Sequence, residues 1–110
     1  MTLPIVDDAV QFRREIGARL WAVRTFHKIG QAKFARSLGL NQSVYHKWES
    51  GSIFPRELKM RDFCNLYRVD FNYIYGGIYD NMPEQMAVRL HDLILFKISQ
   101  MVVEIRIAAE

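Results

Sequence analysis

The chain has 110 residues, of which 50% are hydrophobic, and a single cysteine, Cys64. This length allows one domain, or one domain with a short appendage; the hydrophobic content excludes a disordered chain, and a lone cysteine excludes an intramolecular disulfide. The net charge of +3 is uneven: residues 1–68 carry twelve Lys or Arg and six Asp or Glu, whereas residues 69–110 carry three and six. The basic part favours a polyanionic partner, although a merely solvated basic face gives the same counts.

The first predicted helix begins at Asp7 or Asp8, either of which can act as its N-cap, and runs to about Lys28. Its apolar side chains recur at steps of three and four residues, which predicts one buried stripe. The stripe comprises Ile16, Leu20, Val23 and Phe26. Gly30 ends the segment and can also cap the helix that follows.

Two short helices follow, over residues 31–38 and 42–50. Between them, Gly39 suits the left-handed backbone of a helix end, and Asn41 is a good N-cap for the second of the two. Gly51 is predicted to stop that helix. The inward side chains are expected to be Phe34, Ala35, Leu38, Trp48 and either Val44 or Tyr45.

Three further helices are predicted, over residues 57–68, over the segment FNYIYGG that begins at Phe71, and from Glu84 to about residue 107. Eight of the eleven residues from 93 to 103 are apolar. An amphipathic helix does not need that many, so we expect both sides of this last helix to be covered. The alternation of apolar and charged residues near the end is also typical of a strand, which leaves residues 101–107 open between helix and strand.

The segment from Gln31 to Gly51 has the organisation of a helix-turn-helix, in which two short helices meet at a steep angle through a turn containing Gly. Ala35 is small enough to let the two helices approach, and Gly39 lets the chain reverse. The second helix then projects its first turn outward, and an α-helix fits the major groove of DNA.

On these residues the chain resembles the lambda-repressor-like, Cro-type (Xre) helix-turn-helix family over about residues 12–77. The matching positions are Arg24, Gln31, Ala35, Gly39, Leu40, Trp48, Glu49 and Gly51. The resemblance implies an all-α, five-helix DNA-binding domain over residues 7–77, with residues 78–110 as a long C-terminal helical tail outside the family pattern. It also implies a sequence-specific transcription regulator of bacterial or phage origin, most simply a repressor that binds a palindromic operator as a dimer.

The same resemblance implies roles for individual side chains. Gln42, Ser43 and Lys47 match positions that reach base edges, and Val44 and His46 are close enough to join them. Gln suits an adenine edge, Lys suits guanine acceptors, and Val can contact a thymine methyl group. Arg24 and Glu49 match an internal ion pair of the family that is structural. Tyr45 departs from the Ile or Val usual in the family, and a larger ring there could change the angle of the reading helix.

Contacts to DNA phosphates are expected from polar and basic side chains around the motif. The resemblance implies this role for Gln31 and Asn41, whereas Lys33 and Arg36 could equally be plain surface charges. Among the basic residues that follow the second short helix, we expect Arg56, in the loop after Pro55, to contact the DNA backbone. Gln42, Ser43 and Lys47 could also be ordinary solvated side chains on the surface of a short helix.

The apolar tail could pack on its own domain, form a dimer or bind a different protein. We expect dimerisation, through Leu90, Leu93, Ile94, Met101 and Ile105. Leu95, Phe96, Val102 and Val103 lie off that stripe, and self-packing alone does not accommodate them. Two alternatives stay open for the whole protein. It could be an antitoxin that also neutralises a toxin, or a protein-interaction adaptor that has lost DNA binding.

Nothing in the sequence predicts catalysis or a cofactor. There is no glycine-rich phosphate loop and no nucleophile with supporting residues, and three dispersed histidines with one cysteine make a metal site improbable. The first fifteen residues lack the features of a signal peptide, and no stretch offers about 18 apolar residues without charge. We therefore expect a cytoplasmic, nucleoid-associated protein that is not an enzyme and has no membrane segment.

Overall fold

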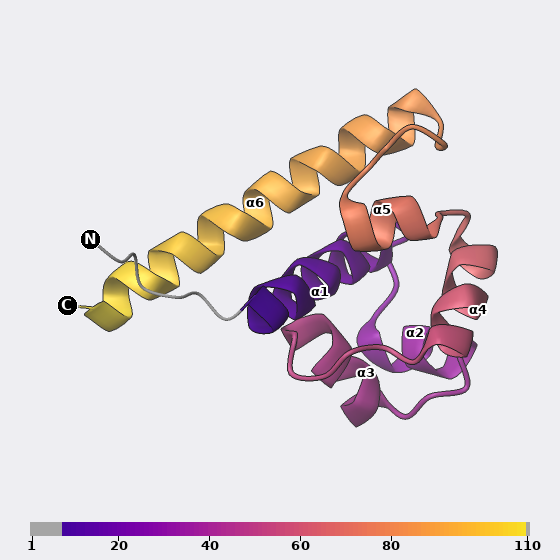
Figure 1. The fold of residues 1–110 in the computed structure, drawn as a ribbon, viewed down its shortest axis with the longest axis horizontal. Coiled ribbons are helices and arrows are strands. Elements are labelled where there is room, and N and C mark those ends of the chain that lie inside the picture. Colours follow the sequence, from indigo (N-terminus) through magenta and orange to yellow (C-terminus); the bar gives the residue numbers. More distant parts are fainter. Residues whose placement is uncertain (1–7, 110) are drawn as a thin grey trace.

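The computed structural model of the chain describes residues 8–109, and at residues 101, 105, 106, 108 and 109 it describes the backbone alone. These residues form six α-helices and no strand, which confirms the predicted all-α fold (Figure 1). The helices are α1 Asp8–Phe26, α2 Gln31–Ser37, α3 Gln42–Ser50, α4 Glu57–Tyr67, α5 Phe71–Gly76 and α6 Glu84–Ala109. Residues 101–107 are part of α6, so the strand alternative is wrong.

The helix ends follow from local side-chain chemistry. Asn41 precedes α3, and its Oδ1 accepts a hydrogen bond from the backbone N–H of Val44 at 2.9 Å. Asp70 caps α5 in the same way, through the N–H of Tyr73 at 2.9 Å. Gly51 ends α3 in a left-handed conformation, with φ of 79°, which a residue with a side chain rarely adopts. The predicted cap Asp7 lies outside the described residues.

Helix α1 is the centre of the fold, between the α2–α3 pair on one side and α6 on the other (Figure 1). The ring of Phe34 joins the helices on the first side. It stacks on Tyr67 of α4, with centroids 4.4 Å apart, and lies 5.0 Å from the ring of Tyr45 in α3. Aromatic pairs at these distances bury a large apolar area and fix the relative positions of three helices.

The first half of α6 belongs to the same core as the helix-turn-helix. Met86, Leu90 and Leu93 are buried in one cluster with residues of α1. Further along, the ring of Phe96 stacks on Trp21 with centroids 6.5 Å apart, and Nζ of Lys97 lies 5.0 Å from the centre of the Trp21 ring. The core therefore continues past residue 77, where the sequence suggested a division of the chain.

This packing corrects part of the predicted dimer interface. Leu90 and Leu93 are buried within a single chain, so they are not available to a second copy. Ile94 is half-buried against the same core. The side chains of Met101 and Ile105, also assigned to the interface, lie outside the described residues. The prediction failed because the periodicity of a helix that is apolar on several faces does not identify the face that contacts its own domain.

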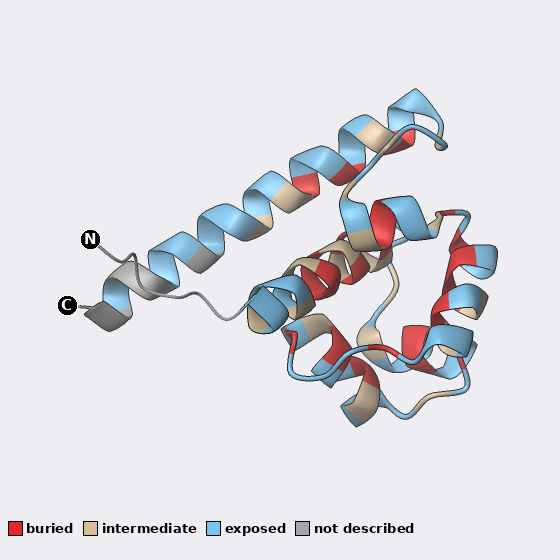
Figure 2. Ribbon diagram, viewed as in Figure 1, coloured by how far each residue is buried: buried red, intermediate tan, exposed pale blue. Residues whose placement is uncertain are grey.

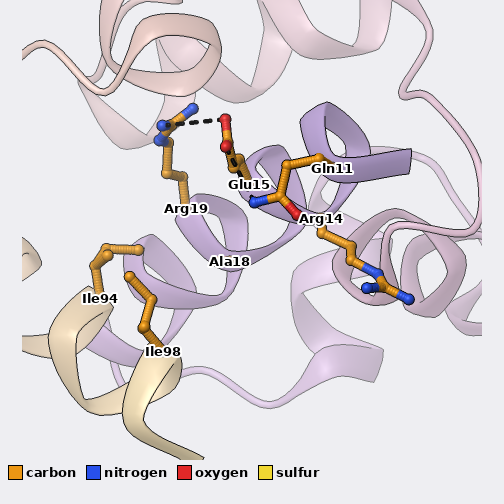
Figure 3. A pocket seen from close by; sticks show the side chains of 7 residues that line it. All are labelled: Gln11, Arg14, Glu15, Ala18, Arg19, Ile94 and Ile98. Carbon is orange, nitrogen blue, oxygen red and sulfur yellow. Dashed lines mark hydrogen bonds and ion pairs between the residues drawn. The ribbon is translucent and has the colours of Figure 1, made fainter. Parts of the chain in front are cut away.

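A hollow remains between α1 and α6, next to this contact (Figure 3). Ala18 and the isoleucines Ile94 and Ile98 form its apolar wall, and Glu15 lies at its polar edge. The Glu15 carboxylate accepts from the Gln11 amide at 3.2 Å. Because Ala18 is small, no side chain of α1 fills the space opposite Ile98, which stays 48% exposed although it faces α1.

Beyond Ile98, every residue of α6 whose burial is described is exposed (Figure 2). No helix of the described residues is long and apolar enough to cross a membrane.

Candidate nucleic-acid interface

The turn between α2 and α3 is held by backbone hydrogen bonds. The N–H of Gly39 donates to the carbonyl of Arg36 at 3.0 Å, and the N–H of Leu40 donates to the carbonyl of Ala35 at 2.9 Å. Gly39 has a φ of 68°, and Ala35 is completely buried where the two helices meet. The small residue and the left-handed glycine thus have the positions that the sequence pattern required, and the N-terminal turn of α3 projects away from the core.

Helix α3 has one buried and one exposed face. Tyr45 and Trp48 are buried, and Val44 is half-buried against the core, so both residues proposed for the inward position contribute. The polar side chains on the other face are exposed: Gln42, Ser43, His46 and Lys47. Together with Gln31 of α2, these four side chains line one shallow hollow in the surface. Val44 lies at the edge of this face.

The polar groups of this face are linked to one another. Nε2 of Gln31 donates to Oε1 of Glu49 at 3.3 Å and lies 3.4 Å from Nδ1 of His46. Asn41 uses its side-chain oxygen to cap α3, and the same oxygen accepts from the hydroxyl of Ser43 at 3.2 Å. The Asn41 carbonyl is therefore occupied, while its amide group is free to donate outward.

An ion pair connects this face to the central helix. Nε of Arg24 in α1 lies 2.7 Å from Oε2 of Glu49 in α3, and its Nη2 donates to Oε1 of Glu49 at 3.0 Å. A third bond runs from Nη1 of Arg24 to the carbonyl of Ile29 at 2.9 Å. The hydrogen bond from the guanidinium to Glu49 raises the pKa of Arg24. Through Glu49, the position of Gln31 on the surface is tied to α1.

Basic side chains surround the polar face. Lys33, Arg36 and Lys47 are exposed, as is Arg56 at the start of α4. None of these four side chains forms a hydrogen bond or ion pair with another described residue. Their charges are therefore available to an external anion, and no acidic side chain of the described chain neutralises them.

Two features of this region escaped sequence reasoning. Gln31 and His46 are 15 residues apart, and no pattern in the sequence indicates that their side chains meet. Gly17 sits inside α1 with no turn to explain it, yet a Cβ there would overlap the backbone carbonyl of Glu49. A glycine in the middle of a long amphipathic helix was the available signal for this close approach.

The described part of the chain gives little support for a metal site or for a reactive cysteine. Residues 8–109 contain no group of three or more His, Cys, Asp or Glu side chains that could hold a metal ion. Cys64 is buried, and burial raises the pKa of its thiol to about 11, so the thiolate is scarce near neutral pH.

Comparison with known proteins agrees with this geometry. A family model described as a helix-turn-helix domain matches residues 17–79. This range includes most of α1 and all of α2 to α5, and it is consistent with the resemblance drawn from the sequence. No curated protein and no solved structure matches the chain.

Proposed function

Because the chain belongs to the helix-turn-helix domain family, which serves DNA-binding regulators, we propose that it represses transcription by binding a palindromic operator as a dimer through α3 in the major groove. The observation that carries this proposal is the convergence of the polar residues Gln42, Ser43, His46 and Lys47 with Gln31 on one exposed hollow. A solvated helix surface has no need to align its polar groups with those of the preceding helix.

Each side chain of this face suits a particular contact in the groove. Gln42 can bond the N6 and N7 atoms of adenine, and Lys47 can donate to the O6 and N7 acceptors of guanine. Ser43 and His46 offer further donors and acceptors beside them, and the half-buried Val44 can contact a thymine methyl group at the edge. These contacts would set the operator sequence.

The phosphate contacts would come from residues around the exposed polar face of α3. Gln31 and the amide of Asn41 lie beside the reading residues, whereas Lys33, Arg36 and Arg56 supply positive charge further out. Such contacts fix the protein on the duplex without reading sequence. In a two-fold dimer, the two copies of α3 would enter successive major grooves about 34 Å apart.

The test measures affinity for an operator selected from a random DNA pool, alongside a non-operator duplex. Gln42→Ala and Lys47→Ala should each weaken operator binding by about 1–3 kcal/mol and leave non-operator binding nearly unchanged, because each loses a base contact. Arg56→Ala should weaken both duplexes alike and lower the salt dependence by about one counterion.

Gln85→Ala is the matched control, since Gln85 is exposed on α6 away from the polar face. Unchanged operator affinity in both Gln42→Ala and Lys47→Ala would reject the assignment of α3 as the reading helix. Absence of any salt-sensitive binding to bulk DNA would instead favour an adaptor that has lost DNA binding.

One observation favours a second candidate function. The distal half of α6 exposes several apolar side chains, which is also what an antitoxin would offer to its toxin. A toxin gene beside this one, together with co-purification of the two products, would support that function. The two functions are compatible, because an antitoxin of this fold also binds its own operator.

A further inference from the structure

The distal half of α6 carries an apolar stripe centred on the side of the helix opposite Leu90. Four consecutive positions of this stripe are about half exposed: Leu95 at 52%, Phe96 at 54%, Val102 at 46% and Val103 at 53%. On a helix of 3.6 residues per turn the centre of this set lies opposite Leu90, which packs on α1, whereas Phe96 lies at its edge, three residues beyond Leu93. We call this set the outer stripe. Single exposed apolar residues are ordinary, but a continuous row is typical of an interface.

Neighbouring apolar residues do not belong to the outer stripe. Ile98 lines the hollow between α1 and α6 and faces Ala18 (Figure 3). Phe96 also contacts Trp21 through one side of its ring, yet more than half of it remains exposed. The helix therefore has an inner apolar face that its own domain covers and a second apolar face that α1 covers only at its edge, through Phe96.

A polar line runs along the middle of the outer stripe. It contains Asp92 and Ser99, which are both exposed and lie seven residues apart. A further step of seven residues along the sequence reaches Arg106. A step of seven returns to nearly the same face of a helix. In sequence the line thus runs from a negative residue, Asp92, through the small neutral Ser99 to a positive residue, Arg106, of which the structure describes the backbone alone.

This order of charges distinguishes the two ways in which a second copy of α6 could pair. Parallel helices in register would bring Asp92 against Asp92 and Arg106 against Arg106, which repel. Antiparallel helices that cross at Ser99 would bring Asp92 against Arg106 at both ends. The small side chain of Ser99 would allow the helices to approach at the crossing point.

We propose that two copies of the chain pair through the outer stripe of α6, antiparallel, with the two-fold axis at Ser99. Leu95 then lies opposite Val103 of the second copy, and Phe96 opposite Val102 of the second copy. This arrangement rests on the dimer of the proposed function and specifies its surface and orientation. It is isologous, so each contact occurs twice.

Cysteine cross-linking tests the pairing in the full-length protein without DNA. Cys64, the only native cysteine, is buried and does not compete. Ser99→Cys should form a disulfide-linked dimer under mild oxidation, and a mixture of Leu95→Cys with Val103→Cys should form a mixed dimer. Leu95→Cys alone should not cross-link, because antiparallel helices keep its two copies eight residues, about two turns or ~12 Å, apart along the helix axis, which is too far for a disulfide. The control is Gln85→Cys, which lies on α6 outside the paired region.

Charge reversal provides an independent measurement. Asp92→Arg turns two attractive contacts into two repulsive ones and should raise the dimer dissociation constant about tenfold in sedimentation. Adding Arg106→Asp in the same chain should restore the wild-type constant, since the attractive pairs re-form with their charges exchanged. In a parallel dimer the single substitution would replace one repulsion with another and leave the constant nearly unchanged.

The outcomes separate this inference from the proposed function. Cross-linking of Leu95→Cys alone, or a dimer in which Ser99→Cys fails to cross-link, would overturn the antiparallel pairing while operator binding persists. If the antiparallel pairing is overturned in this way, loss of operator binding in Gln42→Ala and Lys47→Ala would still support α3 as the helix that reads DNA. A protein that cross-links as expected but binds no DNA would retain the pairing and reject the regulator.

Discussion

Arg24 and Glu49 form a two-point ion pair that fixes α3 to α1 at the centre of the fold. Its shorter contact is 2.7 Å, and the side chains are only 16% and 7% exposed. Arg24 lies in the last turns of α1 and Glu49 near the end of α3, so the pair determines how α3 is oriented relative to α1. The same carboxylate holds Gln31 through Oε1.

We therefore expect Glu49→Ala to cost about 3 kcal/mol of unfolding free energy, because it leaves the largely buried Arg24 charge without a partner. Urea denaturation followed by circular dichroism gives this value. Asp62→Ala is the matched control: its ion pair with Arg61 is exposed and should contribute less than about 1 kcal/mol. Similar costs for the two variants would contradict a structural role for the Arg24–Glu49 pair.

Gly17 allows α1 to contact the end of α3. A Cβ at this position would overlap the backbone of Glu49 and Trp48, and neither backbone can move without displacing the reading helix. Gly17→Ala should therefore destabilise the protein by about 3 kcal/mol and weaken operator binding. Thermal unfolding and a gel-shift measure the two effects.

Gly76→Ala serves as the comparison for Gly17→Ala. A Cβ at Gly76 would meet only the end of the Ile78 side chain, at 3.4 Å, so this variant should be neutral or slightly stabilising. If Gly17→Ala unfolds at the same temperature as the wild type, the close approach of α1 to α3 is not a constraint on this position.

Leu90 and Leu95 are chemically identical residues of α6 with opposite surroundings. Leu90 is completely buried, whereas Leu95 is 52% exposed. Leu90→Ala should cost about 3 kcal/mol, at the low end of the range for a buried leucine, at every protein concentration. Leu95→Ala should leave the stability of the monomer nearly unchanged and instead weaken association. Unfolding curves recorded at two protein concentrations separate the two cases.

Leu90 and Leu95 also show what could not be predicted from the sequence, namely which face of α6 packs on its own domain. The helices and their ends could be predicted because capping is local: Asn41 precedes α3 and Gly51 ends it, as their chemistry required. The exposed polar face of α3 followed from the helix-turn-helix pattern. The orientation of α6 did not follow, because a helix apolar on several faces gives no unique inner face, and Leu90 was therefore assigned to the wrong contact.

Contacts between residues far apart in the sequence could not be predicted from it either. The contact between Gln31 and His46, and the packing of Gly17 against Glu49, join residues far apart in sequence through the angles between helices. Those angles depend on side chains that interlock across α1, α2 and α3, whereas a sequence pattern describes one helix at a time.

Tyr45 replaces the smaller aliphatic residue expected at this point of α3, and its ring is accommodated in the core against Phe34 and Trp48. Its hydroxyl is buried close to the side chains of Arg24 and Glu49, but neither lies in good hydrogen-bond geometry with it. Tyr45→Phe removes this unpaired hydroxyl and keeps the ring, so it should leave stability unchanged or raise it by about 1 kcal/mol. A loss of more than 1 kcal/mol in urea unfolding would mean that the hydroxyl is bonded in solution.

The same substitution should alter the response of the protein to alkaline pH. Burial, and to a smaller extent the charge of Glu49, raises the pKa of Tyr45 above the ordinary value of 10.0. In the unfolded chain the phenol loses its proton near pH 10 while the folded protein retains it, so stability falls as the pH rises above about 10. Tyr45→Phe eliminates this contribution, and its unfolding free energy should decline less between pH 9 and about 11 than that of the wild type. Tyr73→Phe should behave similarly, since its hydroxyl is also buried without a partner and its pKa is raised by burial. Parallel pH profiles for Tyr45→Phe and the wild type would show that Tyr45 titrates alike in the folded and unfolded chains, which is incompatible with a buried phenol at this position.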